Sequence, residues 1–219
     1  MKKITKLLPL FAFAVSLGSY AAAGDFATLC SLQAKDIELA AENIPVPVPQ
    51  VPVNIAKPDQ QLLNKFDALK RDFVSLRIKT DSARCEMSRL TLEAMRLAQT
   101  GGSHLSFQSD LMRVSTDLTR YISEARNLVY AVTNILPLAQ KDRELNLRAL
   151  DMQASAKSML NLADFSGRLE WAIGSVPPAT IGYTAAVRVR EISRQADEFT
   201  GHAEQVYDKA MELVKNTKL

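Results

Sequence analysis

The chain has 219 residues, of which 47% are hydrophobic, 23% charged and only 6% aromatic. This composition is typical of a folded protein and excludes collagen-like, low-complexity and intrinsically disordered chains. With 8 Gly and 9 Pro it also argues against an all-β fold, which requires more turn residues and more aromatic or β-branched strand residues.

The first 23 residues have the three parts of a secretory signal peptide. Three lysines stand within the first six residues, an apolar run covers residues 7–20, and three alanines follow at 21–23. The run is too short to span a bilayer comfortably, and no later stretch reaches the roughly 18 apolar residues of a transmembrane helix. The sequence therefore predicts an exported protein of bacterial type, periplasmic, secreted or on the cell surface, whose mature chain has no transmembrane segment.

The mature chain that follows residue 23 carries 24 basic and 24 acidic side chains, so its net charge is zero. The sequence pI of 8.8 is therefore a property of the precursor with its basic leader. Binding to nucleic acid depends on an excess of positive charge over the interacting surface. We accordingly expect no nucleic-acid partner.

Two short segments precede the main helical region. Residues 24–43 place apolar side chains such as Phe26, Leu32 and Ile37 at helical spacings, which predicts an N-terminal helix. Residues 44–58 contain prolines at 45, 47, 49 and 52, which exclude a helix and favour polyproline geometry. We expect a stiff, extended, Pro-rich strap whose Val and Ile side chains lie on the rest of the protein.

The two cysteines of the chain, Cys30 and Cys85, form an even pair in a chain predicted to be exported, which favours a disulfide. The bond would close a loop of about 56 residues and contribute about 4 kcal/mol in the chain-entropy model. A redox-active pair would need the Cys-x-x-Cys spacing, so we expect a structural staple. Cys85 falls on the side of its helix turned away from the apolar seam, and the helix over 24–43 is therefore expected to lie along the outer face of the helix over 59–100.

Four stretches of residues 59–219 repeat apolar residues at alternating spacings of four and three, the seam of coiled-coil-type helices. Gly101-Gly102 ends the first stretch and Pro137 ends the second, because neither position favours continuation of a helix. The seams run from Leu62 to Leu97, from Leu111 to Ile135, from Leu145 to Ala163 with Leu169 and Ile173 extending it, and from Val189 to Leu213.

Further apolar residues beside the seams, among them Ile78, Leu147, Leu150 and Val187, widen each apolar face. A wide face predicts that each helix contacts two neighbours, as in a bundle. The short connections predict that successive helices run in opposite directions. The predicted fold is all-α: an elongated antiparallel four-helix, coiled-coil-like bundle over 59–219, with an extra N-terminal helix and the Pro-rich strap.

No pattern of catalytic or metal-binding residues occurs in the sequence. The two histidines, His104 and His202, lack the helical neighbours that metal sites use, and are interpreted as solvated side chains. No Gly-rich phosphate loop, nucleophile elbow or haem-attachment motif is found. We therefore expect no enzyme activity, no cofactor and no metal ion.

The best candidate for a partner-binding surface is the end of the predicted bundle near residues 176–183. The single tryptophan, Trp171, lies close to this loop, and Arg168, Ile181 and Tyr183 share that end. Aromatic residues and arginine are enriched at interface hot spots. The alternative is that Trp171 caps the bundle and shields its last core layer.

A basic strip is a second candidate surface. It would comprise Arg188, Arg190 and Arg194, with Arg143 and Arg148 elsewhere on the bundle. Arginines can serve an interface, but they also form ordinary solubilising faces.

These features favour a non-enzymatic protein of the bacterial cell envelope that acts through protein–protein interaction, as a structural or assembly subunit or an adaptor. Its expected partners are other envelope or secretion-apparatus proteins, and an oligomer is compatible with the pattern. In size and helical class the chain is similar to the minor pilus-tip subunits of type IV secretion systems, which is one alternative. The other is a helical bundle that binds an apolar ligand, a lipid or a membrane between or through its helices.

Overall fold

The computed structural model describes residues 59–100 and 105–219, and this part of the chain contains helices and no strand. The predicted signal peptide 1–23, helix 24–43 and strap 44–58, together with Cys30 and His104, lie outside the described residues. The elements are α2 (Gln60–Thr100), α3 (Leu105–Ile135), the short 3₁₀ helix η1 (Leu136–Leu138), α4 (Arg143–Met159), α5 (Leu162–Gly174) and α6 (Pro178–Thr217).

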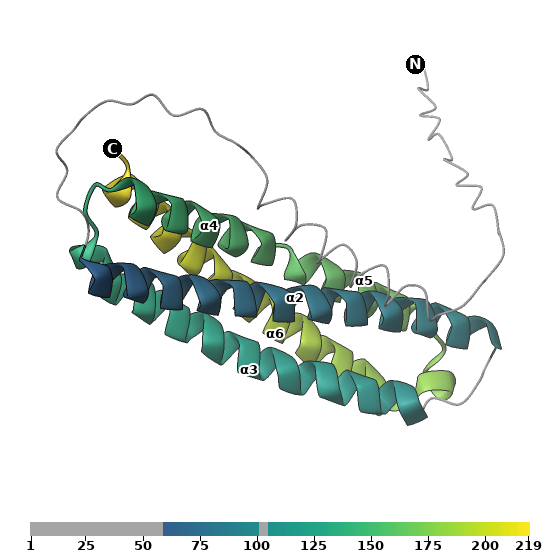
Figure 1. The fold of residues 1–219 in the computed structure, drawn as a ribbon. Coiled ribbons are helices and arrows are strands. Elements are labelled where there is room, and N and C mark those ends of the chain that lie inside the picture. The colour runs from purple at the N-terminus through teal and green to yellow at the C-terminus, as the bar shows by residue number, and fades with distance from the viewer. Residues whose placement is uncertain (1–58, 101–104) are drawn as a thin grey trace, which may run out of the picture.

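The prediction of an all-helical protein with four helices packed together is confirmed (Figure 1). α4 and α5 follow one another along the same line and make up one arm, while α2, α3 and α6 are the other three. α2 packs against α3 on one side and against α4 and α5 on the other; α6 packs against α3, α4 and α5. None of the described helices is both long and apolar enough to cross a membrane.

Side chains that bridge the arms reveal their relative directions. α2 and α4 run the same way, because Asp67 bonds to Arg148 and, one turn further along both helices, Lys70 bonds to Asp151. In contrast, α2 and α3 run in opposite directions. α3 and α6 also run in parallel (Figure 1). The predicted antiparallel packing therefore describes two of the four side-by-side pairs of arms, α2 with α3 and the α4–α5 arm with α6.

The connection between α3 and α4 explains this arrangement. Pro137 stands within η1, which directly follows α3 and contacts α6 as well. The chain thus passes across the end of the bundle before α4 begins. As a result, α4 lies beside α2 rather than beside the helix that precedes it in the sequence.

The core is made of the predicted seams. Every predicted seam residue of α2 from Phe66 to Leu97 is buried, as are those of α3 from Leu111 to Ile135 and of α6 from Val189 to Leu213. Full burial of each such Val, Leu, Ile, Phe or Met side chain contributes about 1.5–3 kcal/mol. The heptad pattern therefore identified the inner faces of three arms correctly.

The third arm departs from its predicted seam. Ala163 was expected in the core, but Leu162 is fully buried and Ala163 only partly. The buried series Ala156, Met159, Leu162 has two spacings of three in succession, so the pattern is one residue short of the four–three alternation. Such a discontinuity changes the local winding of a helix. Accordingly, the arm breaks into α4 and α5 at residues 160–161.

Arg84 of α2 covers this break. Its guanidinium donates to the carbonyl oxygen of Ser158 near the end of α4, and its Cζ lies 6.0 Å from the ring centroid of Phe165 in α5. A terminal carbonyl that lacks a helical partner is thereby satisfied by a neighbouring arm.

The flanking apolar residues behave only in part as predicted: Ile122 is buried, and Leu63, Val129, Leu160 and Val214 pack against the core. Ile78, Leu147, Leu150 and Val187 are exposed rather than packed on a second neighbour. Between α2 and α4 the flanking positions are instead bridged by the charged pairs described above. The prediction that wide apolar faces make each second contact is therefore wrong at these four positions.

Candidate functional site

Large apolar side chains face solvent at the end of the bundle where α2 ends, α3 begins, α5 ends and α6 begins (Figure 1). Each of the four arms contributes to this surface, and each residue lies within ten positions of its helix end. Exposed apolar residues also occur toward the opposite end of the bundle, among them Tyr130, Leu138, Leu147, Leu150 and Leu219. The end near α5 and the start of α6 differs in carrying two exposed aromatic side chains, Trp171 and Tyr183. The surface is called the tip and comprises Leu92 and Met95 of α2, Met112 of α3, Trp171 of α5, and Tyr183 and Val187 of α6.

Trp171 and Tyr183 are the most exposed members of the tip, at 68% and 80%. The alternative that Trp171 shields the last core layer is therefore wrong. The reason is its position on α5: it lies between the buried Leu169 and Ile173, two residues from each, and two residues correspond to about 200° around a helix. Trp171 thus projects away from the core by helical geometry.

Arg168 and Ile181 complete the set of tip residues that the sequence predicted. Arg168 lies about one helical turn before Trp171. Its guanidinium carbon is 5.4 Å from the ring centroid of Phe165, in cation–π geometry. Ile181 belongs to the first turn of α6, and its side chain lies outside what the structure describes. Trp171 and Tyr183 therefore share the end of the bundle, while Arg168 is held against the side of α5.

A backbone break shapes the start of α6. Gly182 has φ 75° and ψ 153°, which separates the first turn from the long helix that follows. A side chain is strained at such a positive φ, and only glycine adopts this conformation readily. The Cβ of any other residue here would also stand 3.6 Å from the Gln108 amide nitrogen of α3. Tyr183 is thus presented directly after a fixed bend.

An ionic network joins α2 to α3 just inside the tip. Arg89 bonds to Glu86 and Glu93 of its own helix and to Asp110 of α3, and Arg113 of α3 bonds back to Glu86. The hydrogen bond from Arg89 is the largest cause that holds the pKa of Glu86 below its usual value, and burial opposes it. The same contacts raise the pKa of Arg89. The network holds the two helices that carry Leu92, Met95 and Met112.

The arginines of the predicted basic strip do not all carry free charge. Arg194 pairs with Glu191 and Glu198, and Arg148 pairs with Asp67. The hydrogen bond from Arg194 lowers the pKa of Glu191. A continuous basic strip is therefore not formed, because these two arginines are neutralised by their own and neighbouring helices.

His202 is partly buried between α3 and α6 rather than solvated. Its Nε2 accepts a hydrogen bond of 2.9 Å from Nε of Arg126, which also binds Glu198. A ring nitrogen that accepts from arginine is not available to a metal ion. Across residues 59–100 and 105–219, no group of three or more His, Cys, Asp or Glu side chains could hold a metal.

Sequence reasoning missed three members of the tip, Leu92, Met95 and Met112. In the sequence, each of them is an apolar residue outside the seam and near a predicted helix end. That pattern alone does not distinguish an exposed residue from one that packs against a neighbouring helix. Only the arrangement of the arms shows that they share one end of the molecule.

Comparison with known proteins adds no relative to this description. No family model matches the chain, and no significant match is found among the curated proteins or the solved structures. The class that the fold and the tip define is a protein of four packed helical arms with an apolar, aromatic end.

Proposed function

We propose that this chain is an exported, non-enzymatic helical-bundle protein of the bacterial cell envelope that acts through protein–protein interaction, as a structural or assembly subunit or an adaptor. The observation that supports this most is the tip, where Trp171, Tyr183 and Met112 face solvent on a fixed frame. Export rests on the leader at 1–23, and the proposal includes the elongated bundle, the N-terminal helix and the strap predicted from the sequence.

Exposed aromatic side chains favour a protein partner for a thermodynamic reason. Interface hot spots are enriched in tryptophan and tyrosine, and truncation of one typically costs 2 kcal/mol or more of binding free energy. The tip also has little conformational entropy to lose, because the bend at Gly182 and the network around Arg89 already order the helix ends. Binding at the tip would therefore retain most of the free energy of burying its side chains.

The apolar-ligand alternative receives less support. The largest seam side chains, including Phe66, Phe73 and Phe199, are fully buried in the core. A ligand between the arms would have to displace these contacts, at a cost of several kcal/mol for each aromatic side chain. The proposed mode of action thus uses the surface and leaves the core closed.

The test is photo-crosslinking in the cells that produce the protein. A benzophenone amino acid is placed at Trp171 or Tyr183, and at Tyr130 as a control, because Tyr130 is 71% exposed but lies toward the other end of α3. We expect reproducible links from the two tip positions to an envelope protein, and no such product from position 130. A secretion-apparatus component in the product would favour the pilus-tip alternative.

Two results would contradict the proposal. Equal crosslinking from positions 130, 171 and 183 would show that the tip has no special role, and links only between copies of the chain would remove the apparatus interpretation. A paired measurement uses Trp171→Ala with Tyr183→Ala. We expect at least a tenfold loss of affinity for the captured partner, with the midpoint of unfolding unchanged within error.

A further inference from the structure

The outer face of α2 differs from that of the other long helices. Its outward column, opposite the seam, contains apolar residues in the middle of the helix, and Ile78 and Leu92 are exposed by 48% and 51%. On α3 the corresponding column is hydroxyl-rich over three of its four positions. The α2 column is Arg71, Ile78, Cys85 and Leu92; the α3 column is Ser109, Thr116, Ser123 and Tyr130.

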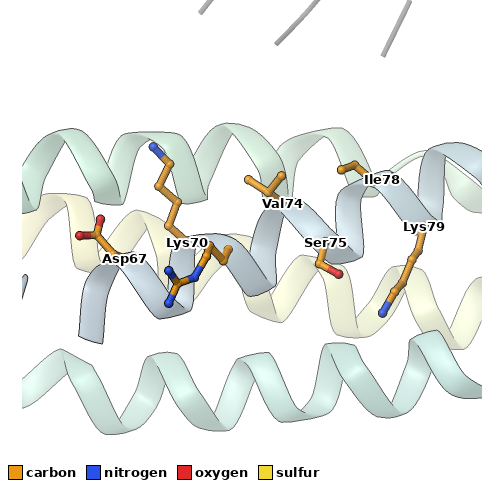
Figure 2. Close-up of a pocket in the computed structure, with 7 residues that line it drawn as sticks. Asp67, Lys70, Val74, Ser75, Ile78 and Lys79 are labelled. Carbon is orange, nitrogen blue, oxygen red and sulfur yellow. The ribbon is translucent and has the colours of Figure 1, made fainter. Parts of the chain in front are cut away.

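A pocket lies along this face of α2, and its described lining residues all belong to that one helix (Figure 2). Val74 and Ile78 point to the same side and supply its apolar part. Lys70, Arg71 and Lys79 give it a mainly basic border, with Asp67 as the one carboxylate among the described lining residues. An occupant that fits would therefore present apolar side chains flanked by carboxylates.

The basic border is only partly neutralised. Lys70 pairs with Asp151 and Lys79 with Glu124. Arg71, by contrast, forms no ion pair or hydrogen bond with the described residues, so it is the cation of this border that an occupant would meet.

We propose that residues 24–43 of the same chain cover this outer face of α2, fastened by a disulfide between Cys30 and Cys85. The segment has the required chemistry, since its apolar residues stand at helical spacings and it is acidic overall. Its carboxylates would meet Arg71 while its apolar side chains cover Val74 and Ile78. The charged residues of the segment are Asp25, Asp36, Glu38 and Glu42 against Lys35.

The chain is long enough to make this contact within one molecule. Cys85 lies about 39 Å along α2 from residue 59, at 1.5 Å per residue. The Pro-rich stretch 44–58 reaches roughly 45 Å at about 3.1 Å per residue. A helix from Cys30 to residue 44 adds about 21 Å. The sulfur of Cys30 can therefore reach Cys85, although the chain between them passes through the start of α2.

The bond forms by oxidation of the two thiols. Both S–H bonds break, the two Sγ atoms join, and two electrons and two protons pass by thiol–disulfide exchange to the disulfide of a protein oxidant, which leaves as a dithiol. Such oxidants operate in the compartments where structural disulfides persist. The product holds the segment on the outer face of α2.

The experiment uses the full exported chain, purified with its thiols blocked at lysis and digested without reductant. We expect a peptide pair joined through Cys30 and Cys85 that disappears on reduction. A benzophenone amino acid at Ile78 should link to residues 24–43, whereas one at Ser123, exposed in the corresponding column of α3, should not. Neither substitution enters the core, so folding is retained.

To learn whether the segment that covers α2 comes from the same chain or from a second copy, isotopically light and heavy protein are mixed before oxidation. Links within one isotope only support the intramolecular arrangement, and mixed pairs would overturn it in favour of a second copy of the chain. The proposal is also overturned if both cysteines are recovered as blocked thiols, or if position 78 links to another protein or to no part of 24–43.

Discussion

At the end of the bundle where α3 passes into α4, polar groups of two arms satisfy one another, whereas at the tip the exposed groups are large and apolar. Asp142 caps α4 through its side chain, and its backbone N–H donates to Thr217 of α6 at 3.1 Å. Asn146 donates to Thr217 and Val214 as well. These contacts join α4 to α6 by short, directional bonds.

The tip is joined differently. Ser175 donates to carbonyls of its own helix α5, and the cross-arm contact nearby is the charged network of Arg89 and Asp110. Both ends leave apolar side chains exposed, at the far end Leu138, Leu147 and Leu219. The two ends therefore differ in how their arms are joined, by hydrogen bonds between α4 and α6 at the far end and by charged pairs between α2 and α3 near the tip.

The largest expected effect is on the free energy of unfolding, and it differs between a buried and an exposed aromatic residue at the tip end of the bundle. Phe107 is fully buried in the first turn of α3. Phe107→Ala should lower the free energy of unfolding by about 3–5 kcal/mol, because it leaves a cavity. Trp171→Ala should change it by less than about 0.5 kcal/mol. Urea unfolding measures both, and similar losses for the two variants would mean that Trp171 is a core residue after all.

A smaller effect is expected at the far end. Asp142→Ala removes a cap that accepts from the N–H groups of Glu144 and Leu145, and should cost about 0.5–2 kcal/mol. Asp142→Asn should recover most of it. The control is Asn161→Ala, because Asn161 precedes α5 without a side-chain capping bond. Hydrogen exchange at residues 144–146 should rise in the first variant only; a similar rise at α5 in the control would contradict the assigned cap.

The smallest effect concerns acid and the network inside the tip. The pKa of Glu86 is lowered in the folded protein, so its carboxylate contributes stability that is present above about pH 4.5 and is lost as the pH falls through the lowered pKa. Glu86→Gln should therefore lower stability at neutral pH and flatten its decline below pH 4.5.

The matched control for Glu86 is Glu191→Gln. The pKa of Glu191 is also lowered by an arginine, but that pair lies within one exposed helix, where ion pairs contribute little. Unfolding curves from pH 7 to pH 3 distinguish the two. An equal slope change in both variants would show that the bond across α2 and α3 adds nothing.

Most of the core could be predicted, because the side chain that faces inward depends on spacing along one helix. Phe73, Leu118 and Phe199 were placed correctly for that reason alone. The break at residues 160–161 was missed, although the pattern held a clue in the apolar residue at 162. A heptad pattern that is one residue short can be accommodated by a shifted seam or by a break in the helix. In the structure the helix breaks, and the Arg84 guanidinium donates to the carbonyl oxygen of Ser158 beside the break.

The tip was predictable in part. Trp171 and Tyr183 were singled out by residue type and by nearness to a loop, but their exposure depends on where the other arms end. Leu92 and Met112 are 20 residues apart in the chain and lie toward the same end of the molecule because α2 and α3 are antiparallel neighbours.

The number of arms, the inner faces of three of them and the absence of strands over the described residues follow from the sequence, because helical periodicity is a local property. That α2 lies beside α4 and that Asp67 neutralises Arg148 follow only from the packing of the arms. Both outcomes depend on the path of the connection after α3 across the end of the bundle. This path brings together residues that are distant in the chain, and helical periodicity in the sequence does not reveal it.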